Sequence, residues 1–250
     1  MFWPVHRLYL VVSSHPSEAV KAALALKGIP YKTVEMPVPT QGLFMRLRFP
    51  ARSVPAMKLD GGEKVQGSIA IMRRLDELVA DPPLLPADEG ARAGVLGAEL
   101  WGADVLQGLA RRVFWGAVKR RPGALASYQE GSQLPRFPAP VVRIVAPALA
   151  RLEIAMHGAG DATVRADLQA LPSHLDTVDE WIASGVLDGA TPNAADLQIG
   201  SSLRFLSTLG DLRPLLAGRP ADQLARRFFP AYPGDVPAGA YPSGWLPARA

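Results

Sequence analysis

The sequence predicts an α/β part at the N-terminus followed by an all-helical part, and three observations lead to this. Strand-like and helix-like stretches alternate over residues 1–80. The proline-rich stretch DPPLLPADE, residues 81–89, then interrupts the pattern as a linker does. Residues 90–227 carry apolar side chains at helical spacing, whereas the prolines of the tail 228–250 exclude a regular helix or a central strand. We therefore expect two domains joined by the linker, with the tail packed on the surface.

The N-terminal part opens with an apolar strand at residues 8–12 that turns directly into a helix with Pro16 in its first turn. The alternation in IPYKTVEM, residues 29–36, predicts a second strand, and an irregular stretch with one short helix follows it. VPAMKLDGGEKVQ, residues 54–66, predicts a hairpin because its Asp-Gly-Gly sequence suits a turn. The segment GSIAIMRRLDELVA predicts a closing helix. We expect that helix to bury Ile69, Met72, Leu75 and Leu78, or close neighbours.

Helical spacing dominates the second part, interrupted by a loop rich in Gly, Pro and Ser. One helix start is marked in detail, because Asn193 is followed three residues later by Asp196, a variant of the capping box. The expected helical segments are 89–120, 139–158, 167–185 and 193–210.

The composition limits what this chain can do. It has 250 residues and no cysteine, so it has neither disulfides nor a thiolate nucleophile of its own, and a cytoplasmic location is expected. The net charge of +4 is too small for a nucleic-acid-binding footprint, and no apolar run has transmembrane length, so neither nucleic acid nor membrane is expected as a partner. His6, His157 and His174 lack metal-ligand spacing, so we expect no metal.

Ser13, Ser14 and His15, which we call the serine turn, lie where the first strand becomes a helix. A helix N-terminus exposes unpaired N–H groups and the positive end of the helix dipole, so this place can bind an anion or stabilise a thiolate. The serines can equally be a simple helix cap, which is the commoner use of serine at this place. These residues alone leave both interpretations open.

Four segments together resemble the glutathione transferase family. SSHPSEAVKAALALKGIPY resembles its first strand-to-helix turn, with an ALALKGI ending typical of zeta-like members, and SVPAMKLDGG resembles its cis-proline segment. VQGSIAIMRRLDE and NAADLQIG resemble its ESxAIxxYL and SxADL segments. WGADVLQGLARR and RADLQALPSHLDTVDEWIASGVL resemble a bacterial branch of that superfamily. The resemblance runs from about residue 7 to residue 217 and implies a thioredoxin-like domain, an all-helical domain and a homodimer.

The resemblance also implies a site for a low-molecular-weight thiol, glutathione or another. Ser14 would donate a hydrogen bond to the sulfur, and the thiolate would attack a small electrophile. The backbone of Val54, before a cis Pro55, would pair with the ligand's peptide-like backbone, and Ser68 would hold its carboxylate at a helix start. The residues implied at the thiol are Ser13, Ser14, His15, Val54, Pro55, Gly67 and Ser68.

Three positions depart from the family pattern. Gly67 stands where Glu or Gln normally holds the amino-acid end of the thiol, and His15 stands where a small residue or proline is usual. No tyrosine ends the first strand, because Tyr9 comes too early. The missing side chain at Gly67 removes a charged hydrogen bond worth about 1.5–3 kcal/mol. Another group substitutes for it, glutathione binds weakly, or the thiol is a different one.

A mixed stripe in the first long helix is the second candidate region. Trp101, Asp104, Gly108, Arg111 or Arg112, and Trp115 recur at spacings of three and four, which predicts one helix face. We interpret that face as lining the pocket for the electrophile between the domains, with an aromatic wall and an anion contact. The alternative is that the tryptophans pack at a domain or dimer interface while Asp104 pairs with an arginine.

The function predicted from the sequence is a thiol-dependent transferase that conjugates or isomerises a small hydrophobic electrophile. A thiol-dependent cis–trans isomerase of the maleylacetoacetate or maleylpyruvate type is the alternative within enzymes, suggested by the zeta-like ALALKGI ending. A non-catalytic member of the fold that binds a ligand or a protein is the alternative outside enzymes. Gly67 favours this last interpretation and the serine turn disfavours it.

Overall fold

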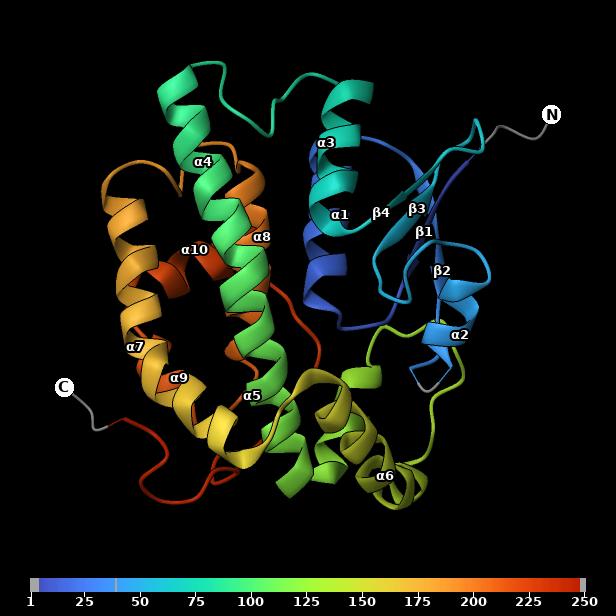
Figure 1. Cartoon of the computed structure of the whole chain (residues 1–250), viewed down its shortest axis with the longest axis vertical. Coiled ribbons are helices and arrows are strands. Elements are labelled where there is room, and N and C mark those ends of the chain that lie inside the picture. Colours follow the sequence, from blue (N-terminus) through green and yellow to red (C-terminus); the bar gives the residue numbers. More distant parts are fainter. Residues whose placement is uncertain (1–4, 39, 248–250) are drawn as a thin grey trace.

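A four-stranded sheet forms the N-terminal part of the computed structural model, which describes residues 5–38 and 40–247 (Figure 1). The strands β1 (His6–Leu10), β2 (Tyr31–Glu35), β3 (Ala56–Lys58) and β4 (Lys64–Gln66) lie in the order β2-β1-β3-β4. β2 runs parallel to β1, whereas β3 is antiparallel to both β1 and β4. The expected βαβ unit and hairpin are therefore confirmed, and so is the α/β class of this part.

Helices cover both faces of this sheet. α1 (His15–Leu26) and α3 (Ser68–Leu78) pack together on the face toward the helical part, while α2 (Gln41–Arg46) lies on the opposite side (Figure 1). A small second core joins α2 and the loop after it to the sheet through Tyr9, Met45, Phe49 and Ala56. α3 buries Ile71, Met72 and Leu75. The predicted burial of Ile69 and Leu78 was wrong, since Ile69 is half-buried and Leu78 is exposed.

The rest of the chain is mostly helical. The expected helix over 89–120 is interrupted by a π-helical segment, and the expected loop after it contains a 3-10 helix. The helix expected over 167–185 begins earlier, at Asp161, and the one expected to end at Gly210 ends at Leu206. The elements are α4 (Glu89–Trp101), η1 (Gly102–Leu106), α5 (Gln107–Arg120), η2 (Pro122–Gln129), α6 (Ala139–His157), α7 (Asp161–Ala183), α8 (Ala194–Leu206), α9 (Arg213–Leu216) and α10 (Pro220–Phe228).

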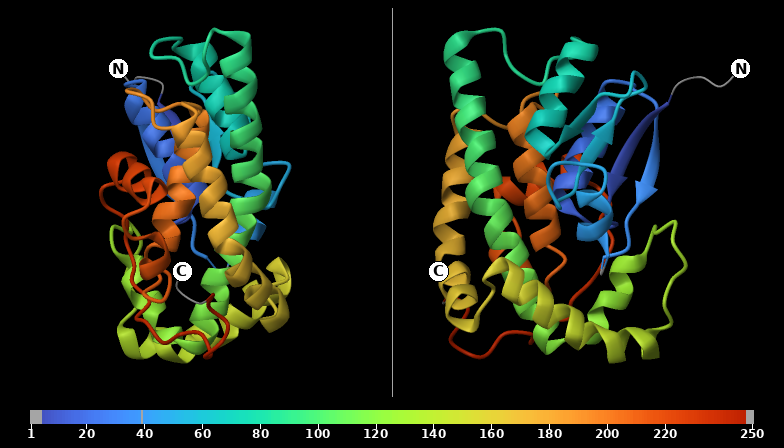
Figure 2. Two further views of the ribbon diagram at one scale, coloured as in Figure 1. Left: turned by 90° about the vertical axis from the view of Figure 1, so that its left-hand side faces the viewer. Right: turned by 45° about the vertical axis from the view of Figure 1, so that its right-hand side comes forward.

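The two parts meet along α1 and α8, which lie side by side (Figure 2). α8 is buried along nearly its whole length, and the predicted capping box at Asn193 and Asp196 is present at its start. Near the linker, the ammonium group of Lys27 is fully buried and donates to the carbonyls of Val79 and Pro82. Its 2.7 Å ion pair with Asp76 supplies the charge partner that a buried lysine requires.

The proline-rich tail packs on the helical part. Val236 forms a β-bridge with Leu209, and the Tyr241 hydroxyl donates to the carbonyl of Val113. Trp245 lies under the guanidinium of Arg120, with 4.6 Å from the cation to the ring centroid. Within the described residues, the helices are too short or too polar to cross a bilayer.

Candidate functional site

The register of the sheet brings three turns to one edge. Tyr9 pairs with Ala56, and Ala56 pairs with Gln66, so the end of β1, the start of β3 and the end of β4 are neighbours. The serine turn follows β1, Val54 and Pro55 precede β3, and the start of α3 follows β4. Residues from three separate parts of the N-terminal sequence, as distant as Ser14 and Ser68, thus gather at one end of the sheet.

Ser14 is the N-cap of α1, but its side chain does not cap the helix. Instead its hydroxyl oxygen accepts a 3.0 Å hydrogen bond from the hydroxyl of Ser17, one turn later. A hydroxyl that accepts one hydrogen bond still has its own proton to donate to another acceptor. Accepting a bond also polarises the O–H group, which makes it a stronger donor. The unpaired N–H groups and the helix dipole add positive potential at the same place. Ser14 is half-buried and can donate to a sulfur at this helix start.

Ser13 holds the turn in a conformation that its side chain and backbone both stabilise. Its φ of 62° lies in the left-handed region, which is unfavourable for serine. Its hydroxyl donates to the carbonyl of Tyr128 at 2.8 Å, and its own carbonyl accepts from the Tyr232 hydroxyl at 2.8 Å. Burial raises the pKa of Tyr232, so this phenol stays protonated as the donor. Two tyrosines from the helical part and the tail therefore fix the serine turn.

His15 is buried between the two parts. Its ring stacks on Phe205 of α8 at 4.9 Å between centroids, and Nδ1 lies 2.9 Å from the hydroxyl of Ser202. Because the Ser202 hydroxyl donates to the Gln198 carbonyl, it accepts from His15, so Nδ1 carries the proton and Nε2 the lone pair. Nε2 is buried without a hydrogen-bond partner among the described residues. Burial, and then the charge of Arg111, hold the pKa of His15 well below 6.5, so the ring is neutral.

The predicted cis-proline is present, since the Val54–Pro55 bond is cis. Val54 lies outside β3, and within the described residues its N–H and C=O make no backbone hydrogen bond. The preceding loop is held by the side chain of Gln66, which accepts from the Ala51 N–H and donates to the carbonyls of Ala51 and Ser53. An extended ligand could therefore pair with Val54 on a loop that is already fixed.

Gly67 and Ser68 complete the edge at the start of α3. Gly67 has a φ of 93°, and its N–H donates to the Pro55 carbonyl at 2.9 Å. A Cβ built on Gly67 would meet no atom within 4 Å, so the space that a longer side chain would need is open. Ser68 is buried in the first turn of α3, where N–H groups favour an anion.

Of the predicted stripe, Arg111 is the member whose charge lowers the pKa of His15 in the serine turn. It is half-buried. Its one side-chain bond is a 3.4 Å contact from Nη2 to the amide oxygen of Gln107, and among the described residues it makes no ion pair. Burial lowers the pKa of Arg111, whereas the negative charge of Glu153 raises it. An incompletely paired guanidinium near a proposed thiolate suits an anionic group on a ligand.

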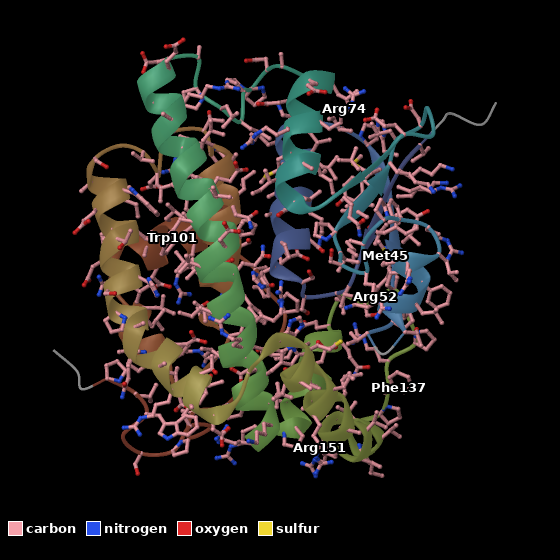
Figure 3. The ribbon with its side chains drawn as sticks, in the orientation of Figure 1. Met45, Arg52, Arg74, Trp101, Phe137 and Arg151 are labelled. Carbon is pink, nitrogen blue, oxygen red and sulfur yellow. The ribbon has the colours of Figure 1, made fainter. Side chains whose placement is uncertain are left out.

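The prediction that Trp101 and Arg112 line a pocket between the domains was wrong, because both face α7. Trp101 meets His174 and Trp181 edge-on at 5.6 and 5.1 Å, and it lies between α4 and α7 (Figure 3). Arg112 makes a two-pronged bond to Asp167, at 2.7 and 2.9 Å. The π-helical segment at residues 102–106 separates Trp101 from Arg111, and its wider turn breaks the phase that the spacing assumes.

Two other members of the stripe also differ from expectation. Trp115 is buried edge-on against Phe114, which also contacts Tyr128 and Phe205, so it belongs to the aromatic packing behind His15 and does not form an open wall. Asp104 is exposed and pairs with no arginine among the described residues, contrary to the alternative interpretation. A cavity of about 440 Å³ shares no lining residue with this edge and is lined by Lys119, Pro147, Ala150, Arg151, Ile154 and Ala155.

Comparison with known proteins finds relatives for part of this chain. The family model described as "Glutathione S-transferase, N-terminal domain" matches residues 8–83, so this part of the chain is similar to that domain. Mouse maleylacetoacetate isomerase is 42% identical over 92 residues, which are 34% of this chain and 42% of the mouse protein. A relative from Arabidopsis thaliana, named glutathione S-transferase Z1, is 36% identical over 90 residues, which are 35% of this chain and 40% of the plant protein. The chain thus spans less than half the length of these two relatives.

Solved structures extend the fold likeness to nearly the whole chain. A glutathione S-transferase from Rhodospirillum rubrum F11 aligns with a TM-score of 0.60 at 20% identity, covering 98% of this chain and 97% of that one. Maleylacetoacetate isomerase from Anaeromyxobacter dehalogenans 2CP-1, solved with bound glutathione, aligns with a TM-score of 0.51 at 20% identity, covering 90% of this chain and 89% of that one. At these identities the likeness shows the fold of the chain, including its helical part.

Several residues around the candidate site were not predicted. Ser17 could have been found, since it lies three residues after Ser14 and therefore on the same helix face. Tyr128, Ser202 and Tyr232 reach the serine turn from more than 100 residues away, and no local pattern connects them to it. In the part of the chain that the structure describes, no cluster of three or more His, Asp or Glu could hold a metal.

Proposed function

We propose that this protein binds a low-molecular-weight thiol at the shared sheet edge, activates it at Ser14 and transfers it to a small electrophile. The observation that carries the proposal is the Ser17-to-Ser14 hydrogen bond, which leaves the Ser14 proton free at the positive end of α1. A free thiol has a pKa of about 8.5, and such an environment lowers it. In this proposal Ser14 is a hydrogen-bond donor, not a nucleophile.

In this proposal the remaining residues of the edge each contact a different part of the ligand. Val54 offers an N–H and a C=O to the ligand backbone, next to cis Pro55. Ser68 offers its hydroxyl and the N-terminus of α3 to a carboxylate, while Ser13 and His15 fix the turn that carries Ser14. Glutathione is the first thiol to consider because a structural neighbour holds it. Since Gly67 offers the amino-acid end no side chain, we also consider another cellular thiol.

An isomerase activity is the second candidate, and Arg111 favours it. The matched relatives from mouse and Pseudomonas aeruginosa are both named maleylacetoacetate isomerase. An incompletely paired cation near the serine turn suits an electrophile that carries a carboxylate. In such a reaction the thiolate adds to a double bond, the bond rotates and the thiolate leaves. We include in the proposal the homodimer and the cytoplasmic location that the sequence predicts.

The test is thermal unfolding of the purified protein with glutathione and, separately, with other small thiols. A ligand that binds the native state raises the midpoint in a concentration-dependent way. We expect a rise with at least one thiol, and Val54→Pro should abolish it by removing the N–H. A rise with a thiol other than glutathione would keep the mechanism and change the cosubstrate. No rise with any thiol would contradict the proposal and favour a non-catalytic binding protein.

A further inference from the structure

Two separate segments expose large apolar side chains on one side of the molecule. On α2 the exposed residues are Leu43, Phe44 and Leu47, and Leu47 is 72% exposed. On α6 and just before it they are Phe137, Val141, Ile144, Val145, Leu152 and Met156, and Ile144 is 79% exposed. Such values mean that these side chains stand out from the surface and do not line a groove. Monomeric proteins rarely expose so many large apolar side chains together without a partner.

The exposed residues of α6 form one stripe along the helix. Val141, Val145, Leu152 and Met156 follow one another at spacings of four, seven and four, and Ala148 fills the gap. The adjacent face of α6, about 100° further around the helix, is buried, with Val142, Ala146 and Ala150. α6 therefore has two apolar faces, one packed against the protein and one exposed to solvent.

The exposed charges within residues 36–59 and 131–152 that lie on these segments are positive. The sequence has no Asp or Glu between residues 36 and 59, or between residues 131 and 152. The exposed arginines there are Arg46, Arg48, Arg52, Arg136, Arg143 and Arg151, and none makes an ion pair with the described residues. Glu153 is buried against His157, and the carboxylate of Glu35 is occupied by Ser132 and the Gln133 N–H. Glu130 marks one border of the surface.

The two segments face the same side. α2 and α6 both lie at the lower right of Figure 1, and the turned views of Figure 2 keep them on one side. Figure 3 places Phe137 between Arg52, near α2, and Arg151 on α6. We call the exposed apolar residues and arginines of these two segments the arginine-rimmed patch.

We propose that the arginine-rimmed patch docks this protein on an anionic lipid bilayer, with α6 lying in the plane of the headgroups. An apolar helix face flanked by cations is the pattern of a helix that lies in a membrane interface. The arginines would meet lipid phosphates while the apolar side chains enter the boundary of the acyl chains. This goes against the sequence-based expectation that excludes membranes, which rested on the lack of a spanning segment.

A second copy of this chain fits the patch less well. A symmetric contact through α6 would bring arginines against arginines, because the exposed patch has no acid to pair with them. A bilayer supplies the missing negative charges over a broad area. Charge complementarity therefore selects the lipid surface over self-association.

The experiment is sedimentation of the full chain with vesicles of phosphatidylcholine alone and with vesicles that also contain phosphatidylglycerol. We expect binding to the anionic vesicles, weakening as salt is raised, and little binding to the neutral ones. Arg143→Glu with Arg151→Glu should lower the binding about tenfold or more. Ile144→Asp with Val145→Asp should lower it as well, and since all four residues are exposed, the thermal midpoint should stay unchanged.

A matched pair separates the patch from overall charge. Arg92→Glu with Arg165→Glu makes the same change in net charge at exposed positions of α4 and α7, and should leave vesicle binding intact. Equal loss with this pair, or no binding to anionic vesicles, would overturn the proposal. Conversion of a dimer to a monomer by the Ile144 and Val145 variant, without lipid binding by the parent protein, would assign the patch to a second copy.

Discussion

The two ends of the proposed thiol site are built very differently. The serine turn is held from every side, by Tyr128, Tyr232, Ser202 and the ring of Phe205. The turn at Gly67, at the other end, has an open space where a longer side chain would sit. In the proposed site, the group that would meet the sulfur is thus fixed, while Gly67 offers no side chain to the amino-acid end of the ligand. We infer that thiol activation and thiol selectivity are separate properties here, and each can be changed alone.

The largest expected effect comes from Ser14→Ala, at the serine-turn end of the proposed thiol site. Removing one donor aimed at a developing charge lowers kcat by about 10²–10³-fold in other enzymes. We expect a loss of that size in thiol transfer, together with a rise in the pKa of the bound thiol, measured by thiolate absorbance against pH. The thermal midpoint should hardly change, because the Ser14 side chain does not cap α1.

Ser17→Ala is the matched control for Ser14. It removes the bond that Ser14 accepts but keeps the Ser14 hydroxyl, so its effect on the rate should be clearly smaller. Equal rates for the Ser14 variant and the parent protein would return Ser14 to the role of a simple helix start.

The next effect is on stability, and His15 carries it. Its pKa in the folded protein lies well below 6.5, so below about pH 6.5 the unfolded chain binds more protons and stability falls. The slope approaches about 1.4 kcal/mol per pH unit at most. Asp196 acts in the opposite direction, because burial raises its pKa to about 6 and its protonation below that pH favours the folded state. Urea unfolding at a series of pH values from neutral to mildly acidic measures the sum.

His15→Phe isolates the histidine contribution. Phenylalanine keeps the stacking on Phe205, and Ser202 keeps its bond to the Gln198 carbonyl. This variant should lose the destabilisation that His15 causes at low pH. The remaining dependence of the unfolding free energy on pH should then be that of Asp196, which stabilises the fold as the pH falls below about 6. His174→Phe is the comparison, since partial burial lowers the pKa of His174 as well. If both variants kept the parent's slope, the neutral buried His15 would be the wrong description.

At the open end, Gly67→Gln should tighten glutathione binding. A hydrogen bond to the charged amino-acid end contributes at least about 1.5 kcal/mol, which is an affinity gain of about tenfold. A side chain at a φ of 93° strains the backbone of the free and the bound protein alike, so this strain lowers stability and leaves the affinity unchanged. Titration calorimetry should find the gain in affinity for glutathione and not for a thiol without that end.

Gly62→Gln is the matched control for this gain. Gly62 has a φ of 89°, no atom within 4 Å of a built Cβ, and a place at the opposite end of β4. It carries the same backbone strain away from the ligand, so it should lower stability without changing affinity. A Gly67 variant that binds glutathione no better than the Gly62 variant would mean that the amino-acid end lies elsewhere.

Local sequence patterns predicted the parts of this site that depend on local structure. Strand alternation, the Asp-Gly-Gly turn and the capping box at Asn193 and Asp196 each determine structure within a few residues, and the structure confirms each of them. The sheet register then follows, and it brings Val54 and Gly67 to the edge beside the serine turn.

The sequence did not predict which way the side chains of a long helix turn, nor which distant segments pack together. The π-helical segment after Trp101 shifts a helix that looks continuous in sequence, so the side chains before and after it turn to different neighbours. Gly102, at its start, lies so close to Ile199 that a Cβ would clash at 2.8 Å, and this close approach to α8 is invisible in the sequence. The tyrosines that fix the serine turn depend on the same packing, because α8 and the tail must first be placed against α1.

The smallest expected effect tests whether the tail belongs to the site. Tyr232→Phe leaves the half-buried carbonyl of Ser13 without its donor, which costs about 1 kcal/mol of stability. Tyr241→Phe removes an equivalent bond from the same tail, which goes to the Val113 carbonyl and not to the serine turn, and should cost a similar amount. Only the Tyr232 variant should also slow thiol transfer, by a few fold, because it loosens the peptide that orients Ser14. Equal rates for the two variants would mean that the tail only stabilises the fold. A slower Tyr232 variant would mean that the tail also helps to position the serine turn.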